Sequence, residues 1–247
     1  MSNQFSDTQQ IRIASLNAHR GKKLERIIDA FQSPQLALCD IILLQEIEEK
    51  FRLNQAELLA NRLGYDVSYL PARLTRRGTH GLAILSRYPV SDVEMLLLPR
   101  NERLINTRNR VAMGATIRIG LETIRVYNVH LDTNINALKR KYQLYPVIAA
   151  ANEHPELPTI IAGDFNTFRR HHTSYLDEML SDSGFRSPFL SGSHYTAKFL
   201  FWRPQLDWIY TRNLVVTRAN VEQDSNCSDH RPLWADAVLP VSEQVWI

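Results

Sequence analysis

The sequence predicts an α/β fold, a four-layered α/β/β/α sandwich in which helices flank two mixed, largely antiparallel sheets. Short apolar runs of strand length recur along nearly the whole chain, and helical patterns separate some of them. Several strand-like runs between residues 81 and 131 follow one another without a helix, which argues against a purely parallel sheet. Runs such as 41–45 and 159–162 are almost entirely apolar, as is typical of strands covered on both faces.

The individual elements follow in chain order. Strands are expected at residues 11–16, 40–45, 81–86, 110–119, 123–131, 159–162, 206–211 and 232–239. Helices are expected at residues 22–31, 54–63, 135–152 and 174–180, the second of them ending before Gly64. In the third helix, apolar residues recur near a period of 3.6 and are expected to pack on a sheet: Ala137, Leu138, Tyr142, Tyr145, Ile148 and Ala149.

The aromatic run at residues 199–202 is expected to be a further buried strand. If it is exposed instead, its rings are suited to stack on bases or to insert into a lipid interface. No repeat, low-complexity tract or linker divides the chain. We therefore expect one domain over residues 1–247, with its core at about 11–239.

The composition is that of an ordinary globular protein. Of 247 residues, 44% are hydrophobic and 22% charged, which excludes disorder and fibrous repeats. The net charge of +3 only weakly favours a polyanionic partner. The two cysteines, Cys39 and Cys227, suit neither a disulfide framework nor a zinc site. Because the sequence contains no signal peptide and no membrane-spanning run, we expect a cytoplasmic protein without integral membrane contact.

Several common catalytic motifs are missing from the sequence. It contains no GxSxG, no GxxxxGK[ST], no HExxH and no GxGxxG pattern. Serine hydrolases with a nucleophile elbow, P-loop NTPases and zincins are thereby excluded.

Polar residues stand instead at the ends of the apolar strand runs: Asn17, Glu46, Asn128, His130, Asp164, Asn166, Asp207, Asp229 and His230. Taken singly, such residues are more often turn formers or helix caps than ligands. Asp207 differs, because it lies between apolar neighbours in a strand and a buried carboxylate needs a partner. Together the group can converge on one rim of the sandwich. Its hard oxygen donors suit Mg²⁺ or Mn²⁺, and its mixture of carboxylates, amides and histidines meets the needs of phosphoester hydrolysis.

The motifs also occur in a recognisable order: SLNAHRG, LLQE, HGLAILSR, VYNVHLDT, IIAGDFNT, QLDWIY and CSDHRPLWA. This series resembles the endonuclease/exonuclease/phosphatase superfamily, which includes DNase I-like nucleases, apurinic endonucleases, sphingomyelinases and inositol polyphosphate 5-phosphatases. The resemblance extends from about residue 11 to residue 239. It implies the four-layered DNase I-like sandwich and hydrolysis of phosphoester bonds, phosphodiesters foremost, with a divalent metal ion.

The resemblance also implies roles for the metal site. Glu46 matches the principal metal ligand of the family, Asn17 lies near the metal and the scissile phosphate, and Asp229 assists the metal site. Asp164 matches the acid that orients or activates the attacking water, and Asn166 the amide that binds a phosphoryl oxygen.

The remaining roles concern the phosphate. His230 would contact it in the transition state and Asp207 would orient His230, because a histidine paired with a buried carboxylate is more readily protonated. His130 resembles the second histidine of many members, and Asn128 supports the same strand end. Arg110 resembles an arginine that reaches the phosphate, with Arg108 as a rival. Some nucleases carry a tyrosine where this chain has Thr79 and His80.

Two substrate classes fit, and nucleic acid is favoured over a phospholipid or an inositol phosphate. Basic residues concentrate near the motifs, where they would steer a polyanion: Arg73, Arg76, Arg77, Arg100, Arg103, Arg108, Arg110, Arg169 and Arg170. Phospholipid gains weight if the 199–202 run is exposed. A third alternative, a noncatalytic binding module on the same scaffold, is less favoured because the whole set of catalytic residue types is present.

Overall fold

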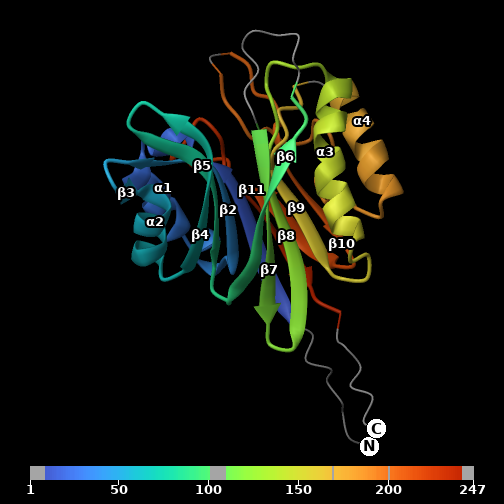
Figure 1. Cartoon of the computed structure of the whole chain (residues 1–247), viewed down its shortest axis with the longest axis horizontal. Coiled ribbons are helices and arrows are strands. Elements are labelled where there is room, and N and C mark those ends of the chain that lie inside the picture. The colour runs from blue at the N-terminus through green and yellow to red at the C-terminus, as the bar shows by residue number, and fades with distance from the viewer. Residues whose placement is uncertain (1–8, 101–109, 169, 200, 241–247) are drawn as a thin grey trace, which may run out of the picture.

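Two β-sheets lie face to face at the centre of the molecule (Figure 1). The computed structural model describes residues 9–100, 110–168, 170–199 and 201–240. The larger sheet has the order β11-β12-β1-β2-β5-β4, with β3 paired to β2. Its strands are β1 (Gln10–Asn17), β2 (Ile41–Lys50), β3 (Leu53–Asn54), β4 (Asp66–Thr75), β5 (Gly78–Ser86), β11 (Val215–Val221) and β12 (Leu233–Val238).

The smaller sheet has five strands in the order β10-β9-β8-β7-β6. These are β6 (Val90–Leu98), β7 (Arg110–Ile119), β8 (Glu122–His130), β9 (Thr159–Asp164) and β10 (Asp207–Arg212). One pair in each sheet is parallel, β1 with β2 and β8 with β9, and the other pairs are antiparallel. The expectation of two mixed, largely antiparallel sheets is therefore confirmed.

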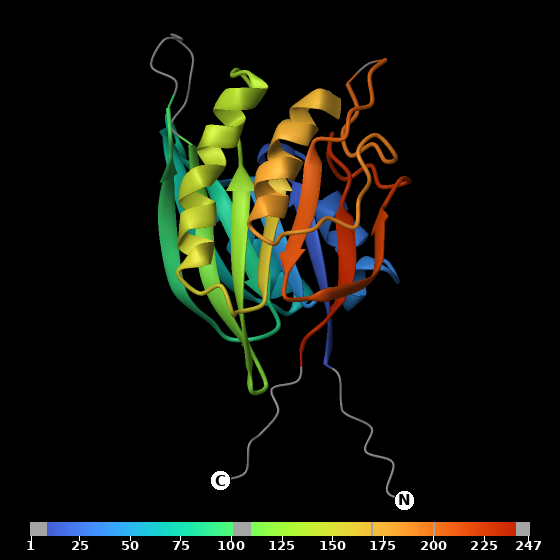
Figure 2. The ribbon, with the colours of Figure 1, turned by 90° about the vertical axis from the view of Figure 1, so that its right-hand side faces the viewer.

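Helices cover the outer face of each sheet (Figures 1 and 2). On the larger sheet lie α1 (Leu24–Phe31) and α2 (Gln55–Leu63), and α1 buries Ile27, Ile28 and Phe31 there. On the smaller sheet lie α3 (Ala137–Asn152) and α4 (Arg170–Asp182). The layers are thus α/β/β/α, as the sequence predicts.

The buried face of α3 differs from the expected one. Leu138, Tyr142 and Tyr145 are exposed, whereas Arg140 and Gln143 are buried among the apolar residues of the helix. Arg140 and Gln143 are buried because both form hydrogen bonds with the segment before the helix. The Arg140 guanidinium donates to backbone carbonyl oxygens of this segment, and the Gln143 Oε1 accepts a hydrogen bond from the backbone N–H of Asp132. These bonds anchor the helix to the loop that follows His130, and a purely apolar periodicity cannot reveal them.

The 199–202 run is also not the buried strand expected from its composition. The backbone of Phe199 pairs with that of Trp202, and both side chains are exposed. Phe201 lies fully in solvent. This paired segment, a hairpin, belongs to neither sheet, and the Trp202 ring packs on that of Phe168.

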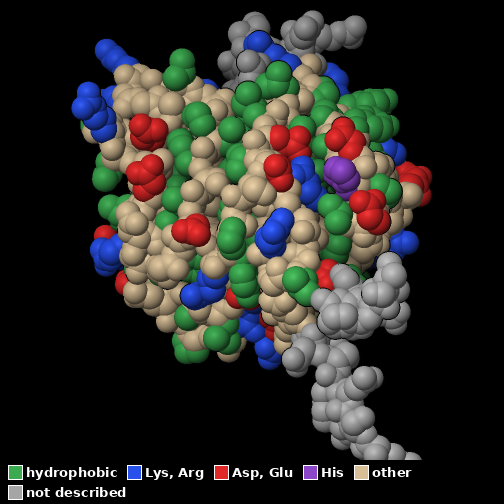
Figure 3. Space-filling view, turned by 60° about the horizontal axis from the view of Figure 1, so that its bottom comes forward, with side chains coloured by type: hydrophobic (Ala, Val, Ile, Leu, Met, Phe, Trp, Pro, Cys, Tyr) green, Lys and Arg blue, Asp and Glu red, His purple; other side chains and the backbone are tan. Residues whose placement is uncertain are grey.

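The two ends of the described chain leave the molecule side by side (Figures 1 and 2), because Gln10 of β1 pairs with Val238 of β12. Acidic and basic side chains are interspersed on this side (Figure 3). β1 therefore runs away from the termini, and its last residue, Asn17, lies at the opposite rim. Among the described residues, no helix is long and apolar enough to cross a membrane.

Candidate active site

The polar residues predicted from the strand ends meet at the rim opposite the termini. Asn17, His130 and Asp164 are the last residues of β1, β8 and β9. Asp207 is the first residue of the antiparallel β10 and pairs with Asp164 in register. His230 precedes β12, which runs antiparallel to β1. Carboxyl ends of some strands and amino ends of their antiparallel neighbours therefore share one edge, which brings together residues far apart in the sequence.

Glu46 reaches the same rim through an irregularity in β2. The pairing of β2 with β5 shifts register between Leu44 and Ile47, and Glu46 has a left-handed backbone with φ of 55°. Such a bulge turns one side chain out of the regular alternation of the strand. The Glu46 carboxylate consequently points towards His130 and His80, whose Nε2 atoms lie 4.0 and 3.8 Å from it.

A buried array of two aspartates and a histidine forms the centre of the site. His230 Nδ1 lies 2.8 Å from Asp207 Oδ2, and its Nε2 lies 4.0 Å from Asp164 Oδ2. The Thr196 hydroxyl also donates to Asp207 Oδ2, at 2.6 Å. Asp207 thus has the partners that its burial requires, and it fixes the ring so that His230 Nε2 faces Asp164.

Asp164 is oriented by two amides. The Asn17 side chain donates Nδ2–H to Asp164 Oδ2 at 3.0 Å, and the backbone N–H of Asn166 donates to Oδ1 at 2.9 Å. The Asn166 side chain donates to the carbonyl oxygen of Leu131 and accepts from the Thr133 hydroxyl. Asn166, which has φ of 52°, is therefore held at the rim beside the aspartate.

The charges in this array are strongly perturbed. Burial by itself lowers the pKa of His230, but Asp207 and Asp164 outweigh it and raise the pKa to about 10. Burial and the negative charge of Asp207 raise the pKa of Asp164 to about 7. At neutral pH the site therefore holds a cationic imidazole beside a carboxyl group that exchanges its proton readily, a pairing suited to acid and base chemistry.

The second histidine has the opposite character. Burial and the charge of Arg110 lower the pKa of His130 well below its ordinary value, so its ring is neutral at pH 7. Its Nε2 lies 3.6 Å from Asp164 Oδ2, which places the ring between Asp164 and Glu46. Burial raises the pKa of Glu46, but the imidazoles of His80 and His130 outweigh it and keep the carboxylate ionised.

Asp229 lies near Asn17 and has a partner that the sequence analysis did not single out. His19 Nδ1 lies 3.1 Å from Asp229 Oδ1, and the Ser228 hydroxyl bonds the same oxygen and the carbonyl of Asn17. His19 has a left-handed backbone with φ of 47°. The only signal in the sequence is that His19 stands two residues after Asn17, within the SLNAHRG motif.

Asn128 takes a supporting position inside the sandwich. It is fully buried, and its Nδ2 donates to the carbonyl oxygens of Leu44 and Ala83 on the facing sheet. Its Oδ1 accepts from Gln45, which the sequence analysis did not single out. Asn128 thus ties the two sheets together beneath the rim, and this geometry favours support of the strand end over contact with a substrate.

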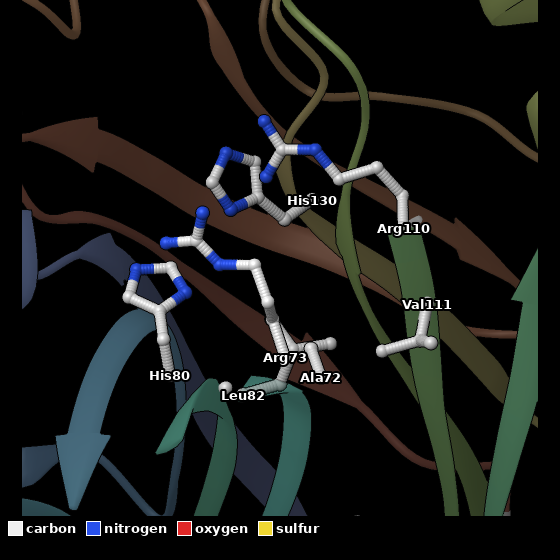
Figure 4. Close-up of a pocket in the computed structure, with 8 residues that line it drawn as sticks. Ala72, Arg73, His80, Leu82, Arg110, Val111 and His130 are labelled. Atoms are coloured by element: carbon white, nitrogen blue, oxygen red, sulfur yellow. The ribbon is translucent and has the colours of Figure 1, made fainter. Parts of the chain in front are cut away.

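A recess rich in basic groups adjoins Glu46 and His130. Arg110 extends from the start of β7 towards His130, and Arg73 extends from β4 between His130 and His80 (Figure 4). Arg110 and Arg73 come from different sheets, so the recess lies where the two sheets meet at the rim. Of the other basic residues near the motifs, Arg103, Arg108 and Arg169 lie outside the described residues.

The donor set of the rim fits a hard divalent cation. Glu46 and Asp229 are partly exposed carboxylates, and the Asn17 Oδ1, which accepts the N–H of His19, keeps a second lone pair. Asp207 Oδ1 is a buried oxygen without a hydrogen-bond donor among the described residues. Oxygen donors with this excess of negative charge suit Mg²⁺ or Mn²⁺. Asp164, Asp207 and His230 also offer ligand atoms within 4.8 Å of one another, but His230 Nδ1 and Asp207 Oδ2 are already hydrogen-bonded to each other.

One family model matches most of the chain. The model of the endonuclease/exonuclease/phosphatase family matches residues 13–230. The chain belongs to this family. The match includes every site residue described above, and the activities for which the family is named all cleave phosphoester bonds.

The relatives extend over different shares of the chain. The uncharacterized protein YbhP of Escherichia coli K12 is 26% identical over 260 residues, which cover 94% of this chain and 98% of YbhP. The UPF0294 protein VV2535 of Vibrio vulnificus is 27% identical over 160 residues, which cover 65% of this chain and 45% of that protein. The chain thus spans less than half the length of VV2535.

Solved structures share the fold at low sequence identity. A mannosyl-6-phosphatase of Bacteroides thetaiotaomicron superposes with a TM-score of 0.73 at 18% identity, covering 93% of this chain and 100% of the other. ANGEL2, a 2′,3′-cyclic phosphatase solved with adenosine-2′,3′-vanadate, superposes with a TM-score of 0.76 at 15% identity, covering 96% and 97%. These similarities confirm the DNase I-like α/β sandwich.

Proposed function

We propose that the protein is a divalent-metal-dependent phosphodiesterase that hydrolyses nucleic acid by in-line attack of water on phosphorus. The observation that carries the proposal is the array of Asp164, His230 and Asp207 beside the carboxylate of Glu46. It combines a carboxyl group of raised pKa with a cationic imidazole in a buried setting. Membership of a phosphoesterase family supports the reaction class.

In this mechanism Asp164 accepts a hydrogen bond from the attacking water and takes up its proton as the new O–P bond forms, while the P–O bond opposite the attacking oxygen breaks and the leaving oxygen departs with that bond's electron pair. Asn17 and the backbone of Asn166 hold the carboxylate in place for that transfer. His230 donates from Nε2 to a phosphoryl oxygen, where negative charge accumulates in the transition state. Asp207 keeps the imidazole protonated and oriented.

Arg110, His130 and Asn166 complete the phosphate-binding set on this proposal. Arg110 supplies positive charge beside His130, whose neutral ring directs a hydrogen bond to the phosphate (Figure 4). Glu46, Asp229 and Asn17 would hold Mg²⁺ or Mn²⁺. When bound, such an ion supplies charge neutralisation at the phosphoryl and leaving oxygens.

Nucleic acid is favoured because the basic side chains of Arg73 and Arg110 line the recess beside the site and suit a polyanionic substrate. The adenosine-2′,3′-vanadate in the ANGEL2 structure supports the same substrate class. One observation favours the alternative of a phospholipid or inositol phosphate, namely the fully exposed Phe201 near the site, which suits a lipid interface.

A substrate panel tests the proposal. The purified chain is incubated with Mg²⁺, Mn²⁺ or EDTA and with plasmid DNA, abasic duplex, RNA, sphingomyelin, phosphoinositides or bis(p-nitrophenyl) phosphate. We expect metal-dependent cleavage of the nucleic acids and of the chromogenic diester. Activity on lipid alone would overturn the nucleic-acid assignment, and inactivity on the whole panel would favour a noncatalytic binding module.

Substitutions at the centre of the site test the mechanism. We expect Asp164→Ala, Glu46→Ala and His230→Ala each to lower kcat by at least ~100-fold, as loss of a positioned catalytic group does. Circular dichroism and thermal unfolding serve as controls that each variant is folded. A folded His230→Ala enzyme with full activity would refute the role assigned to that histidine.

A further inference from the structure

A second pocket, of about 300 Å³, adjoins the candidate active site. Thr167, the residue after Asn166, forms part of its wall, as does Trp202 of the exposed hairpin. The hairpin leads back to the catalytic array, because the Phe199 ring lies 6.2 Å from that of Trp202 and 6.4 Å from the imidazole of His230. A substrate whose phosphate lies against His230 therefore has this pocket as its neighbour.

The aromatic wall of the pocket leaves part of one ring, that of Trp202, open to solvent. Phe168 and Trp202 stack with ring centroids 5.3 Å apart and an interplanar angle of 20°. Trp202 is 46% exposed, so part of its indole remains uncovered. Arg203, also in the lining, lies over the ring of Tyr195 at 5.2 Å. Exposed ring faces beside a guanidinium are the surfaces on which single-stranded nucleic acid bases stack.

A buried donor without an acceptor also lines the pocket. Gln205 is only 7% exposed, and its Oε1 accepts the backbone N–H of Gly192 at 2.9 Å. Its Nε2 has no hydrogen-bond acceptor within the part of the chain that the structure describes. Because an unsatisfied buried donor costs free energy, this amide is suited to a ligand that brings its own acceptor.

The other residues that line the pocket show whether it is better suited to a nucleobase or to an acyl chain. They are largely polar and include Thr173, Ser191, Ser193 and His194. An acyl chain would cover these groups without offering them a hydrogen bond, which is unfavourable. A nucleobase combines a flat apolar face with a polar edge and satisfies both parts of the wall.

We propose that this pocket, between the stacked Phe168 and Trp202 and the amide of Gln205, binds a nucleobase of the substrate next to the scissile phosphate. The inference rests on the proposed function and assigns it a substrate class, single-stranded nucleic acid. Trp202 supplies the stacking surface, and Gln205 donates from Nε2 to an acceptor on the edge of the base. Neither residue takes part in the chemical step.

Equilibrium binding tests the proposal without relying on turnover. The full chain carrying Asp164→Asn is titrated, in Mg²⁺, with fluorescein-labelled tetrathymidylate and with an abasic tetramer of the same charge and length. We expect tetrathymidylate to bind about tenfold more tightly or better, as stacking of bases on aromatic rings provides. Trp202→Ala should remove most of this preference, and Gln205→Glu, which keeps the oxygen that Gly192 contacts, should weaken it.

The matched control is Phe201→Ala, because Phe201 is an exposed aromatic residue of the same hairpin that does not line the pocket. It should leave the preference for tetrathymidylate at its original value. Equal affinity for the two tetramers, or a preference that survives Trp202→Ala, overturns the proposal. The chain is also tested for binding to vesicles of phosphatidylcholine and phosphatidylserine. If Trp202→Ala and Phe201→Ala both abolish this binding, and the chain binds the two tetramers equally, the hairpin contacts lipid and the proposed base pocket is wrong.

The outcome is independent of catalysis. A preference that depends on Trp202 supports the pocket even if the unsubstituted chain cleaves no nucleic acid, in which case the proposed function alone fails. Conversely, metal-dependent cleavage of DNA or RNA by a chain that shows no preference for tetrathymidylate over the abasic tetramer overturns only the pocket. Thermal unfolding of each variant shows whether a change in affinity reflects a change in folding.

Discussion

His230 is surrounded by carboxylates, and Asp164 shares its site with a second aspartate. The two groups therefore titrate far from their ordinary pKa values, at about 10 and about 7. On the proposed mechanism Asp164 acts as a base and must be deprotonated, whereas His230 acts as a donor and must be protonated. Activity should be lost below pH 7 as Asp164 gains its proton and above pH 10 as His230 loses its own.

We accordingly expect a bell-shaped dependence of kcat/KM on pH with a maximum between about 7 and 10. The measurement is the rate of hydrolysis of bis(p-nitrophenyl) phosphate from pH 5 to pH 11. Asp207→Asn retains an oxygen that can face His230 but removes the charge that raises its pKa. In this variant the alkaline limb should move to lower pH, and an unchanged limb would show that another group sets it.

Residues at the ends of buried strands could be predicted from the sequence because polar side chains interrupt apolar runs there. Asp164, Asp207 and Glu46 have this signature. His19 and Thr196 do not, since His19 lies in a single 3-10 turn, His19–Gly21, and Thr196 lies between the named elements, where polar residues are common. Their contacts to Asp229 and Asp207 arise only when distant segments meet.

At the level of the elements, the strands that the sequence analysis did not predict lie mainly at the edges of the sheets. β4 and β11 are the two outer strands of the larger sheet, and β6 is an outer strand of the smaller one. Many of their side chains are exposed or half-buried, so they lack the continuous apolar runs of β2 or β9. β4 also contains Pro71 beside a register shift, a residue that edge strands tolerate.

β1, β12 and β11 are joined by an ion-pair network that offers a test of element packing. Asp236 of β12 accepts two hydrogen bonds from the buried guanidinium of Arg12 and one from the exposed Arg218. Asp236→Ala leaves the Arg12 charge buried without this partner and should cost about 3–5 kcal/mol of unfolding free energy.

Urea unfolding at pH 7 measures this cost, and Arg218→Ala is the matched control. Arg218 lies mostly in solvent, so its removal should cost about 1 kcal/mol or less. If both variants lose the same unfolding free energy, burial of the ion pair between Arg12 and Asp236 does not determine how much it contributes to stability.

At the scale of the whole molecule, the candidate metal donors come from strands of the larger sheet that lie near the start and near the end of the sequence. Asn17 ends β1, Glu46 lies in β2 and Asp229 precedes β12. A cation held by all three would link these strands and stabilise the folded state in proportion to its binding.

We expect Mg²⁺ at about 100 times its dissociation constant to add about 2.7 kcal/mol to the unfolding free energy. Thermal unfolding with Mg²⁺ and with EDTA should show this as a rise in Tm of several degrees. Glu46→Gln should remove most of the rise while the chain without metal keeps a similar Tm. A rise of the same size in this variant would place the ion elsewhere.

The architecture as a whole could be predicted because layer order follows from the sequence of apolar runs and helices. Pairings between distant strands could not, since apolar runs carry no register. The adjacency of Asp207 and Asp164, for example, depends on β10 and β9 pairing across more than forty residues of intervening chain.

β1 and β12 are neighbours in the larger sheet although more than 200 residues separate them in the chain. While the protein is being made, β1 emerges from the ribosome early and waits roughly 10 to 45 s, at ~5–20 residues per second, for the strand that completes its hydrogen bonds. His230, which stands just before that strand, reaches Asp164 only at the same moment. A nascent chain therefore carries its carboxylates through most of translation in an incomplete site, and on the proposed function hydrolysis of nucleic acid begins only after synthesis has passed residue 238.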